Sequence, residues 1–171
     1  RVTVSTSGLV PEIDRLAADF GGQVRLAISL HSVDNDKRSE IMPINRRYPL
    51  PVLIDALRRY PIAKRARITI EYTLIRGVND TLAEADELVR LLRGVQAKVN
   101  LIPMNPISGS TLGAPEFSSV EKFQARLHEK GMGATIRMQR GDDIAAACGQ
   151  LALSGEKRKV RMRLPRVSES Q

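Results

Sequence analysis

The sequence contains one cysteine, Cys148, within the small-residue segment 145–149. A thiolate is a strong nucleophile, and the Ala and Gly neighbours leave room for a bulky substrate to approach. No His or Lys lies close in the sequence to activate the thiol, so an unreactive cysteine buried in an alanine-rich helix is the competing interpretation. A single cysteine excludes an intrachain disulfide framework and a multi-cysteine metal site built from this chain alone.

Other groups that could hold a ligand lie where predicted strands end. Ser5 lies at a strand-to-helix junction, the segment Ser29-Leu30-His31 ends a strand, and Asn105 lies between two prolines just beyond another strand. Hydroxyl, imidazole and amide groups can bind a polar ligand by hydrogen bonds. Each also has a structural interpretation, as a capped turn, a hydrogen-bonded histidine or a rigid loop.

Strand-like and helix-like segments alternate about every 30 residues, which predicts βαβ units and a parallel sheet. Strands are expected over 2–5, 24–30, 67–75, 99–103 and 134–138. Helices are expected over 11–20, 34–42 and 50–60, from a cap at Asp80 or Thr81 to Arg93, and from a cap at Ser118 or Ser119 to near Gly131. Segment 142–153 is ambiguous, because its composition is helical but Gly149 interrupts it.

Several predicted strands have one apolar and one polar face. In the third, Thr69, Glu71 and Thr73 share the face opposite the apolar side chains, because alternate residues share a face. A doubly wound sheet needs apolar residues on both faces, so a barrel with a polar, ligand-binding lumen fits better. Its site would lie at the carboxyl ends of the strands. About eight strands usually close such a barrel, so with four or five strands either the barrel is partial or its other strands are missing.

The charge suggests a polyanionic partner. The 171 residues have a net charge of +8 and a pI near 10.1, and the basic run 157–163 is either a solvated tail or a set of phosphate contacts. With 3 Tyr, 3 Phe and no Trp, the chain is not typical of modules that stack bases on aromatic rings. No segment approaches the roughly 20 apolar residues of a membrane span.

Six segments occur in the order RVTVSTSGLVP, LAISLH, IMPIN, RITIEYTLI with GVND, VNLIPMNP and RGDDIAAACGQL. In this order they resemble the C-terminal part of the radical S-adenosylmethionine (SAM) RNA methyltransferases of the RlmN/Cfr type. The resemblance implies an α/β fold consisting of the later βα units of a radical-SAM partial (βα)6 TIM-like barrel, truncated at the N-terminus. It implies that residues 1–153 belong to the radical SAM core domain and that 154–171 form a basic C-terminal tail.

The resemblance implies that Cys148 carries the transferred methyl group as S-methylcysteine. The positions that match SAM contacts are Ser5, Ser29, Leu30, His31 and Asn105. It also implies a 4Fe-4S cluster, whose CxxxCxxC ligand motif does not occur in these 171 residues. We therefore expect no metal ligands in this chain and no activity from this chain alone.

The family methylates carbon 2 (RlmN type) or carbon 8 (Cfr type) of adenosine 2503 in 23S rRNA, and the RlmN type often also adenosine 37 of some tRNAs. The target carbon is electrophilic, so polar methyl transfer would fail and radical chemistry is required. The segments RGDD and STSG favour the RlmN type. The resemblance implies a cytoplasmic monomer that acts on 23S rRNA and tRNA with an external electron donor. A noncatalytic basic RNA-binding domain and a TIM-barrel lyase fragment are the alternative hypotheses.

Overall fold

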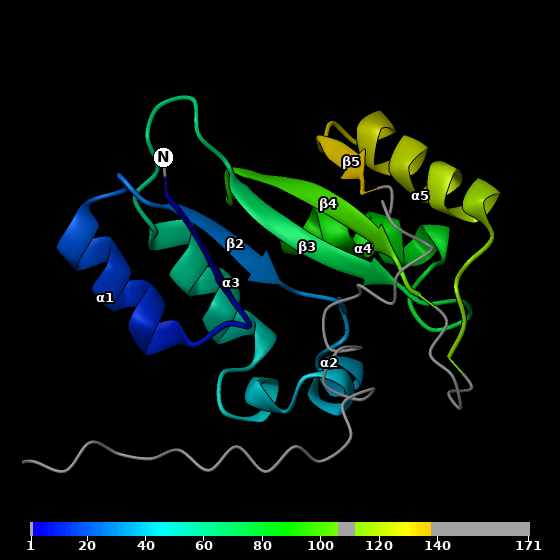
Figure 1. The fold of residues 1–171 in the computed structure, drawn as a ribbon, viewed down its shortest axis with the longest axis horizontal. Helices are drawn as coiled ribbons and strands as arrows, with labels where there is room; N and C mark the ends of the chain where they lie inside the picture. The colour runs from blue at the N-terminus through cyan, green and yellow to red at the C-terminus, as the bar shows by residue number, and fades with distance from the viewer. Residues whose placement is uncertain (1, 106–111, 138–171) are drawn as a thin grey trace, which may run out of the picture. The chain divides into compact units, whose positions relative to one another are not determined.

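Five parallel strands, each connected to the next through helical segments, form one sheet in chain order β1-β2-β3-β4-β5 (Figure 1). The structure is a computed structural model that describes residues 2–105 and 112–137. The strands are β1 (Thr3–Thr6), β2 (Arg25–Ser29), β3 (Ile68–Leu74), β4 (Ala97–Pro103) and β5 (Ala134–Ile136). The helices are α1 (Val10–Phe20), α2 (Asn35–Ile41), the 3₁₀ helix η1 (Pro43–Arg46), α3 (Leu50–Arg59), α4 (Leu82–Leu91) and α5 (Phe117–Glu129).

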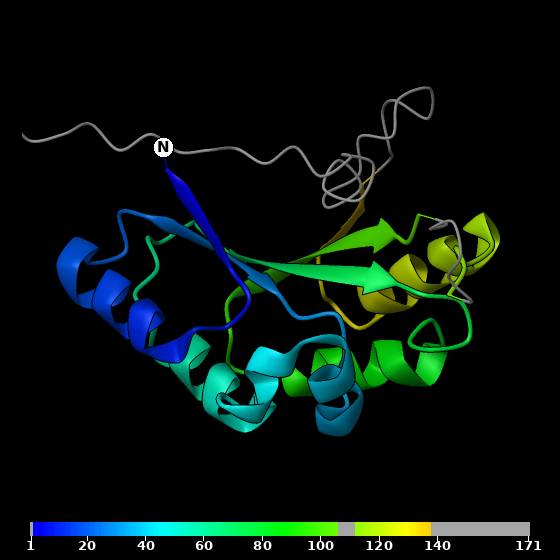
Figure 2. The same ribbon diagram turned by 60° about the horizontal axis from the view of Figure 1, so that its bottom comes forward.

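All these helices lie on the same side of the sheet (Figure 2). A sheet whose strands are added in one direction through crossovers of one hand places every helix on one face. A doubly wound sheet instead reverses direction and covers both faces. The observed order therefore confirms the predicted part-barrel α/β fold, and it leaves the other face of the sheet, hereafter the open face, without helices among the described residues.

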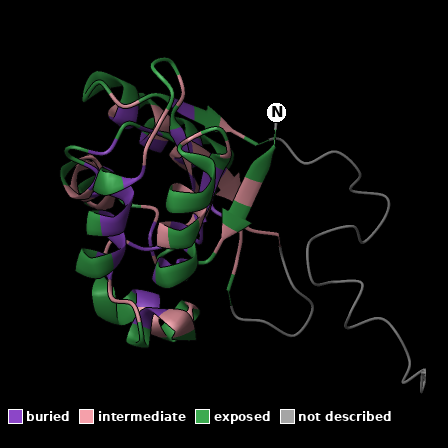
Figure 3. Ribbon diagram, turned by 90° about the vertical axis from the view of Figure 1, so that its left-hand side faces the viewer, coloured by how far each residue is buried: buried purple, intermediate pink, exposed green. Residues whose placement is uncertain are grey.

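The predicted division of the strands into two faces is confirmed most clearly in β3. Its alternate residues Ile68, Ile70, Tyr72 and Leu74 are buried against the helices, whereas the residues between them are only partly buried. The edge strand β1 has no buried residue, and Figure 3 shows it in green and pink without purple. The hydrophobic core therefore lies entirely between the sheet and its helices.

Two predicted helix caps have different outcomes. Thr81 caps α4 in a capping box, because its side chain accepts from the Glu84 N–H and the Glu84 carboxylate accepts from the Thr81 N–H. The predicted cap at Ser118 or Ser119 is wrong. Helix α5 begins at Phe117 with Glu116 in the N-cap position, so both serines lie inside its first turn.

Chain segments 106–111 and 138–171 lie outside the described residues. The chain divides into a unit of Arg1–Met138 and a unit of Gln139–Gln171, and all described residues belong to the first. The predictions for Cys148, for segment 142–153 and for the basic tail therefore stay predictions, as does the proposed division at residue 153.

The buried hydroxyl of Tyr72 provides a test of the core. It has no hydrogen-bond partner among the described residues, and the ring stacks on Phe123 with centroids 5.8 Å apart. Burial raises the pKa of this phenol, so it is a neutral, unsatisfied polar group. Because Tyr72→Phe removes only that group, we expect it to leave stability unchanged or raise it by about 1 kcal/mol in urea unfolding.

Tyr60→Phe is the matched control. The Tyr60 hydroxyl donates to the Val24 carbonyl at 3.0 Å, so its removal should cost about 1 kcal/mol. Equal losses of stability in the two variants would show that Tyr72 has a partner of its own.

Candidate functional site

A buried arginine connects the carboxyl ends of β1 and β2. The Arg38 side chain in α2 is 0% exposed. It donates to the carbonyl oxygens of Ser7 at 2.8 Å, Ser29 at 3.1 Å and Leu30 at 3.0 Å, and to Asn45 Oδ1 at 2.7 Å. These bonds fix the backbone where both strands leave the sheet.

The charge of Arg38 is compensated by carbonyl dipoles, because no carboxylate among the described residues forms an ion pair with it. Burial lowers its pKa to about 10, so the guanidinium stays charged at neutral pH. Gly8 passes close above it with φ of 108°, and a Cβ there would lie 3.1 Å from Leu53 and 3.4 Å from Arg38. The strand-to-helix junction after Ser5 therefore requires glycine at this position.

The amide of Asn45, in the IMPIN segment, extends this network. Its Nδ2 group donates to the Asn35 carbonyl at 2.9 Å and to Ser39 Oγ at 2.8 Å. Asn35 Oδ1 in turn accepts from the Leu50 N–H at 3.1 Å. Helix α2, η1 and the start of α3 are thereby held together around Arg38.

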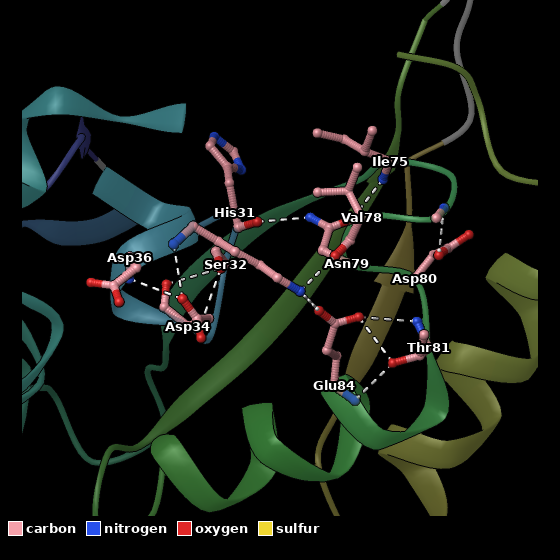
Figure 4. A network of polar contacts seen from close by, with 12 residues as sticks. His31, Ser32, Asp34, Asp36, Ile75, Val78, Asn79, Asp80, Thr81 and Glu84 are labelled. Atoms are coloured by element: carbon pink, nitrogen blue, oxygen red, sulfur yellow. Dashed lines mark hydrogen bonds and ion pairs between the residues drawn. The ribbon is translucent and has the colours of Figure 1, made fainter. Parts of the chain in front are cut away.

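A second buried amide joins the ends of β2 and β3 (Figure 4). The Nδ2 group of Asn79 donates to the carbonyls of His31 and Thr73, both at 2.7 Å, and its Oδ1 accepts from the Ile75 N–H at 2.7 Å. Asn79 is 0% exposed. The GVND segment thus positions the backbone of the predicted ligand residue His31.

His31 has a left-handed backbone, with φ of 59°, and its ring Nδ1 accepts from the Thr73 N–H at 3.1 Å. Burial, and secondarily the positive charge of Arg38, lower its pKa to about 4. The ring is therefore neutral at pH 7, and because Nδ1 accepts, Nε2 carries the proton. No described residue accepts from Nε2, which leaves a neutral N–H donor at the carboxyl edge of the sheet.

The predicted ligand residues differ in their exposure and in whether their polar groups are already hydrogen-bonded. Ser5 is exposed and Ser29 is half-buried on neighbouring strands of the open face, and neither hydroxyl has a partner among the described residues. The Leu30 side chain lies in the core, and its N–H and carbonyl are already bonded to Glu71 and Arg38. Asn105 is half-buried two residues beyond β4, at the same edge of the sheet.

The open face contains one carboxylate near these groups. Glu71 pairs in register with Ser29 on β2 and with Asn100 on β4. Thr135 Oγ1 donates to Asn100 Oδ1 at 3.3 Å, whereas Glu71 has no side-chain partner among the described residues. The face is therefore lined by hydroxyl, amide and carboxylate groups that are available to a polar ligand.

These groups suit SAM, which has ribose hydroxyls, an amino acid portion and a sulfonium cation. Ser29 can donate or accept, and His31 can donate without adding a positive charge that would repel the sulfonium. Residues 2–105 and 112–137 contain no group of three His, Cys, Asp or Glu side chains that could hold a metal ion. None of the described helices is long and apolar enough to span a bilayer.

Two positioning residues, Arg38 and Asn79, had no recognised role in the sequence. Arg38 reaches a carbonyl 31 residues away, and Asn79 reaches one 48 residues away. Both occur in polar segments that are typical of solvated helices or turns. Asn79 lies within GVND, one of the segments that carry the resemblance, whereas Arg38 lies outside all of them and only its partner Asn45 belongs to IMPIN.

Solved structures place this fold among radical SAM enzymes. A radical SAM methyltransferase from Sphaerobacter thermophilus matches 88% of this chain with a TM-score of 0.81 and 53% identity, over 44% of its own length. A domain of pyruvate-formate lyase-activating enzyme from Bacteroides vulgatus matches 80% of both chains with a TM-score of 0.60 at 20% identity, a likeness of fold alone. No protein-family model matches the chain.

Among radical SAM enzymes, curated sequences that match this chain include RNA methyltransferases. The dual-specificity RNA methyltransferase RlmN of Sorangium cellulosum is 60% identical over 96% of this chain and 42% of its own length. That of Chelativorans sp. is 49% identical over 96% of this chain and 40% of its own length. The chain belongs to the RlmN family of radical SAM methyltransferases and spans about two-fifths of the length of the curated relatives it matches.

Removal of the Arg38 side chain should disrupt the edge. In Arg38→Met, three carbonyls and the Asn45 amide lose a buried donor, so we expect a loss of at least about 3 kcal/mol in urea unfolding. Arg59→Met is the control, because Arg59 forms an exposed 2.8 Å pair with Asp14 that should contribute less than about 1 kcal/mol. Similar losses in both variants would contradict the role given to Arg38.

The neutral His31 predicts a pH dependence of stability. Its pKa is about 4 in the folded chain against 6.5 in the unfolded chain, so the unfolded state binds more protons between these values. Stability should be full above pH 6.5 and fall toward pH 4, by on the order of 3 kcal/mol.

His31→Asn should remove this contribution, since Asn tolerates a left-handed backbone and does not titrate. Urea unfolding of both proteins across pH 4–6.5 isolates the effect, because the carboxylates are common to both. Parallel pH profiles would exclude a buried neutral His31.

Proposed function

We propose that this chain is the part of an RlmN-type RNA methyltransferase that contacts SAM and carries the methyl group. The substrate would be carbon 2 of adenosine 2503 in 23S rRNA and of adenosine 37 in some tRNAs. Cys148 would hold the methyl group as S-methylcysteine, and SAM would be bound at the carboxyl edge of the sheet. One observation carries the proposal: the hydroxyls of Ser5 and Ser29 and the Nε2 group of His31 have no partners among the described residues, in a chain 60% identical to an RlmN over 164 residues.

The residues at the edge have distinct proposed roles. Ser5 and Ser29 would hydrogen-bond polar groups of SAM from two neighbouring strands, while Asn105 would supply an amide from the exit of β4. His31 would donate a hydrogen bond from Nε2. Its low pKa keeps the ring uncharged throughout the neutral range. Leu30 would position its neighbours Ser29 and His31, because its side chain is 0% exposed in the core and its backbone is bonded to Glu71 and Arg38.

Bound SAM, with a 4Fe-4S cluster held by cysteines outside this chain, would supply the radical chemistry that an electrophilic adenine carbon requires. The contribution of this chain is orientation. Arg38 and Asn79 fix three strand ends through carbonyl oxygens, so the side chains that face SAM project from backbone that is already ordered. A preorganised site of this kind loses little entropy when it binds.

The test uses the protein purified from the complete open reading frame, loaded with its cluster, and mass spectrometry of nucleosides from 23S rRNA. We expect 2-methyladenosine, and Cys148→Ala should lower its yield by at least about 1000-fold, as expected for loss of a covalent carrier. The product 8-methyladenosine would indicate the Cfr type instead. Full activity of Cys148→Ala would refute the proposed carrier.

Ser29→Ala addresses SAM binding separately. Loss of one hydrogen bond should raise the dissociation constant for SAM about fivefold, measured by calorimetry without turnover. Ser118→Ala is the matched control, because Ser118 is exposed on α5 and neither caps it nor faces the site. An unchanged affinity in Ser29→Ala would remove that residue from the site.

A further inference from the structure

The amino ends of the strands, at the opposite edge of the sheet from His31, carry a group of exposed cations. We define this basic edge as Arg25, Lys64, Arg65, Arg67 and Lys98. Arg25 begins β2, Arg67 directly precedes β3, and Lys98 is the second residue of β4. Lys64 and Arg65 belong to the connection from α3 to β3, which projects past the start of β3 in Figure 1.

Strand register places three of these cations on the open face. Ala27 on β2, Thr69 on β3 and Lys98 on β4 are paired in register, so all three lie on the open face. Residues two apart in a strand share a face, so the residues two positions before Ala27 and Thr69 also lie there. These two positions are Arg25 and Arg67, and they line the same small hollow between the starts of β2 and β3. Two exposed arginines therefore lie close together at this edge, and arginine can bind a phosphate through paired hydrogen bonds.

The charge of these five cations is not neutralised by ion pairs within residues 2–105 and 112–137. The connections that lead from α1, α3 and α4 into β2, β3 and β4, residues 21–24, 60–67 and 92–96, contain no Asp or Glu. By contrast, Arg15, Arg58, Arg59 and Arg90 on the helices are each paired with a carboxylate. The basic edge is thus a local excess of positive charge.

We propose that the basic edge binds the sugar-phosphate backbone of the RNA substrate. The choice of RNA rests on the proposed function, and the surface itself rests on the charge distribution. Strand β3 has seven residues, so the two edges of the sheet are separated by on the order of 20 Å. One adenosine at the carboxyl edge cannot reach that far, so the basic edge would contact nucleotides that flank the target and would contribute affinity without sequence selectivity.

The test compares two triple variants with the same change in net charge. The edge variant is Arg25→Gln with Lys64→Gln and Arg65→Gln. The control variant is Arg15→Gln with Arg90→Gln and Lys122→Gln, three exposed cations on helices α1, α4 and α5. Both retain the basic run 157–163, so its contribution is constant.

Binding of a fluorescein-labelled single-stranded RNA to the 171-residue chain is followed by anisotropy over a range of salt concentrations. The edge variant should bind at least about tenfold more weakly, and the slope of log K against log salt should fall in magnitude by about 2, which corresponds to three lost phosphate contacts. The control variant should change neither quantity appreciably. Equal effects of the two variants, or none, would overturn the proposal.

Lysine acetylation gives a second measurement that needs no substitution. Bound RNA should protect Lys64 and Lys98 but not Lys122. Absence of protection would contradict the proposal. So would protection of Lys64 in the complete protein before RNA is added, because another segment of the same protein would then cover the edge.

The two proposals can fail separately. If the complete protein methylates RNA normally and the edge variant binds RNA as the wild type does, RNA binding by the basic edge is refuted and the proposed function stands. If SAM does not bind but the edge variant still loses affinity for RNA, the proposed function is refuted and RNA binding by the basic edge is supported.

Discussion

The carboxyl edge of the sheet depends on one buried guanidinium. Where parallel strands end, their last carbonyl oxygens lose strand partners, and an unpaired buried acceptor is costly. Arg38 satisfies three of these oxygens from two strands and continues through Asn45 into η1 and α3. Its charge also helps to lower the pKa of His31, so the same side chain influences both the backbone geometry and the protonation of the site.

The site separates groups that hold the backbone from groups that face a ligand. Arg38 and Asn79 are 0% exposed and donate their hydrogen bonds to acceptors within the protein. Ser5, Ser29 and the Nε2 group of His31 have no acceptors or donors of their own among the described residues. Such a division allows the exposed groups to be few and small, because their positions do not depend on contacts with one another.

Short-range patterns were sufficient for the fold but not for the site. The two-residue alternation of β3 and a helix cap at Asp80 or Thr81 depend on neighbours in the chain, and both predictions are confirmed, with Thr81 as the cap. The capping pattern at Ser118 was misleading because helical backbone already begins at Phe117. Arg38 and Asn79 were missed because their acceptors lie tens of residues away, where sequence periodicity carries no information. The candidate ligand residues followed from their positions at predicted strand ends, and the resemblance assigned them to SAM, a role that stays a prediction.

The strictly consecutive strand order has a consequence for how this chain acquires its structure. Every strand after β1 pairs with the strand that precedes it in the chain, so each new strand finds its first partner already synthesised. Pairing therefore closes loops of modest length, which keeps the contact order of a parallel sheet low. During synthesis on the ribosome, each βα unit can dock on the preceding unit as it emerges, so the sheet can grow from one edge in the direction of translation.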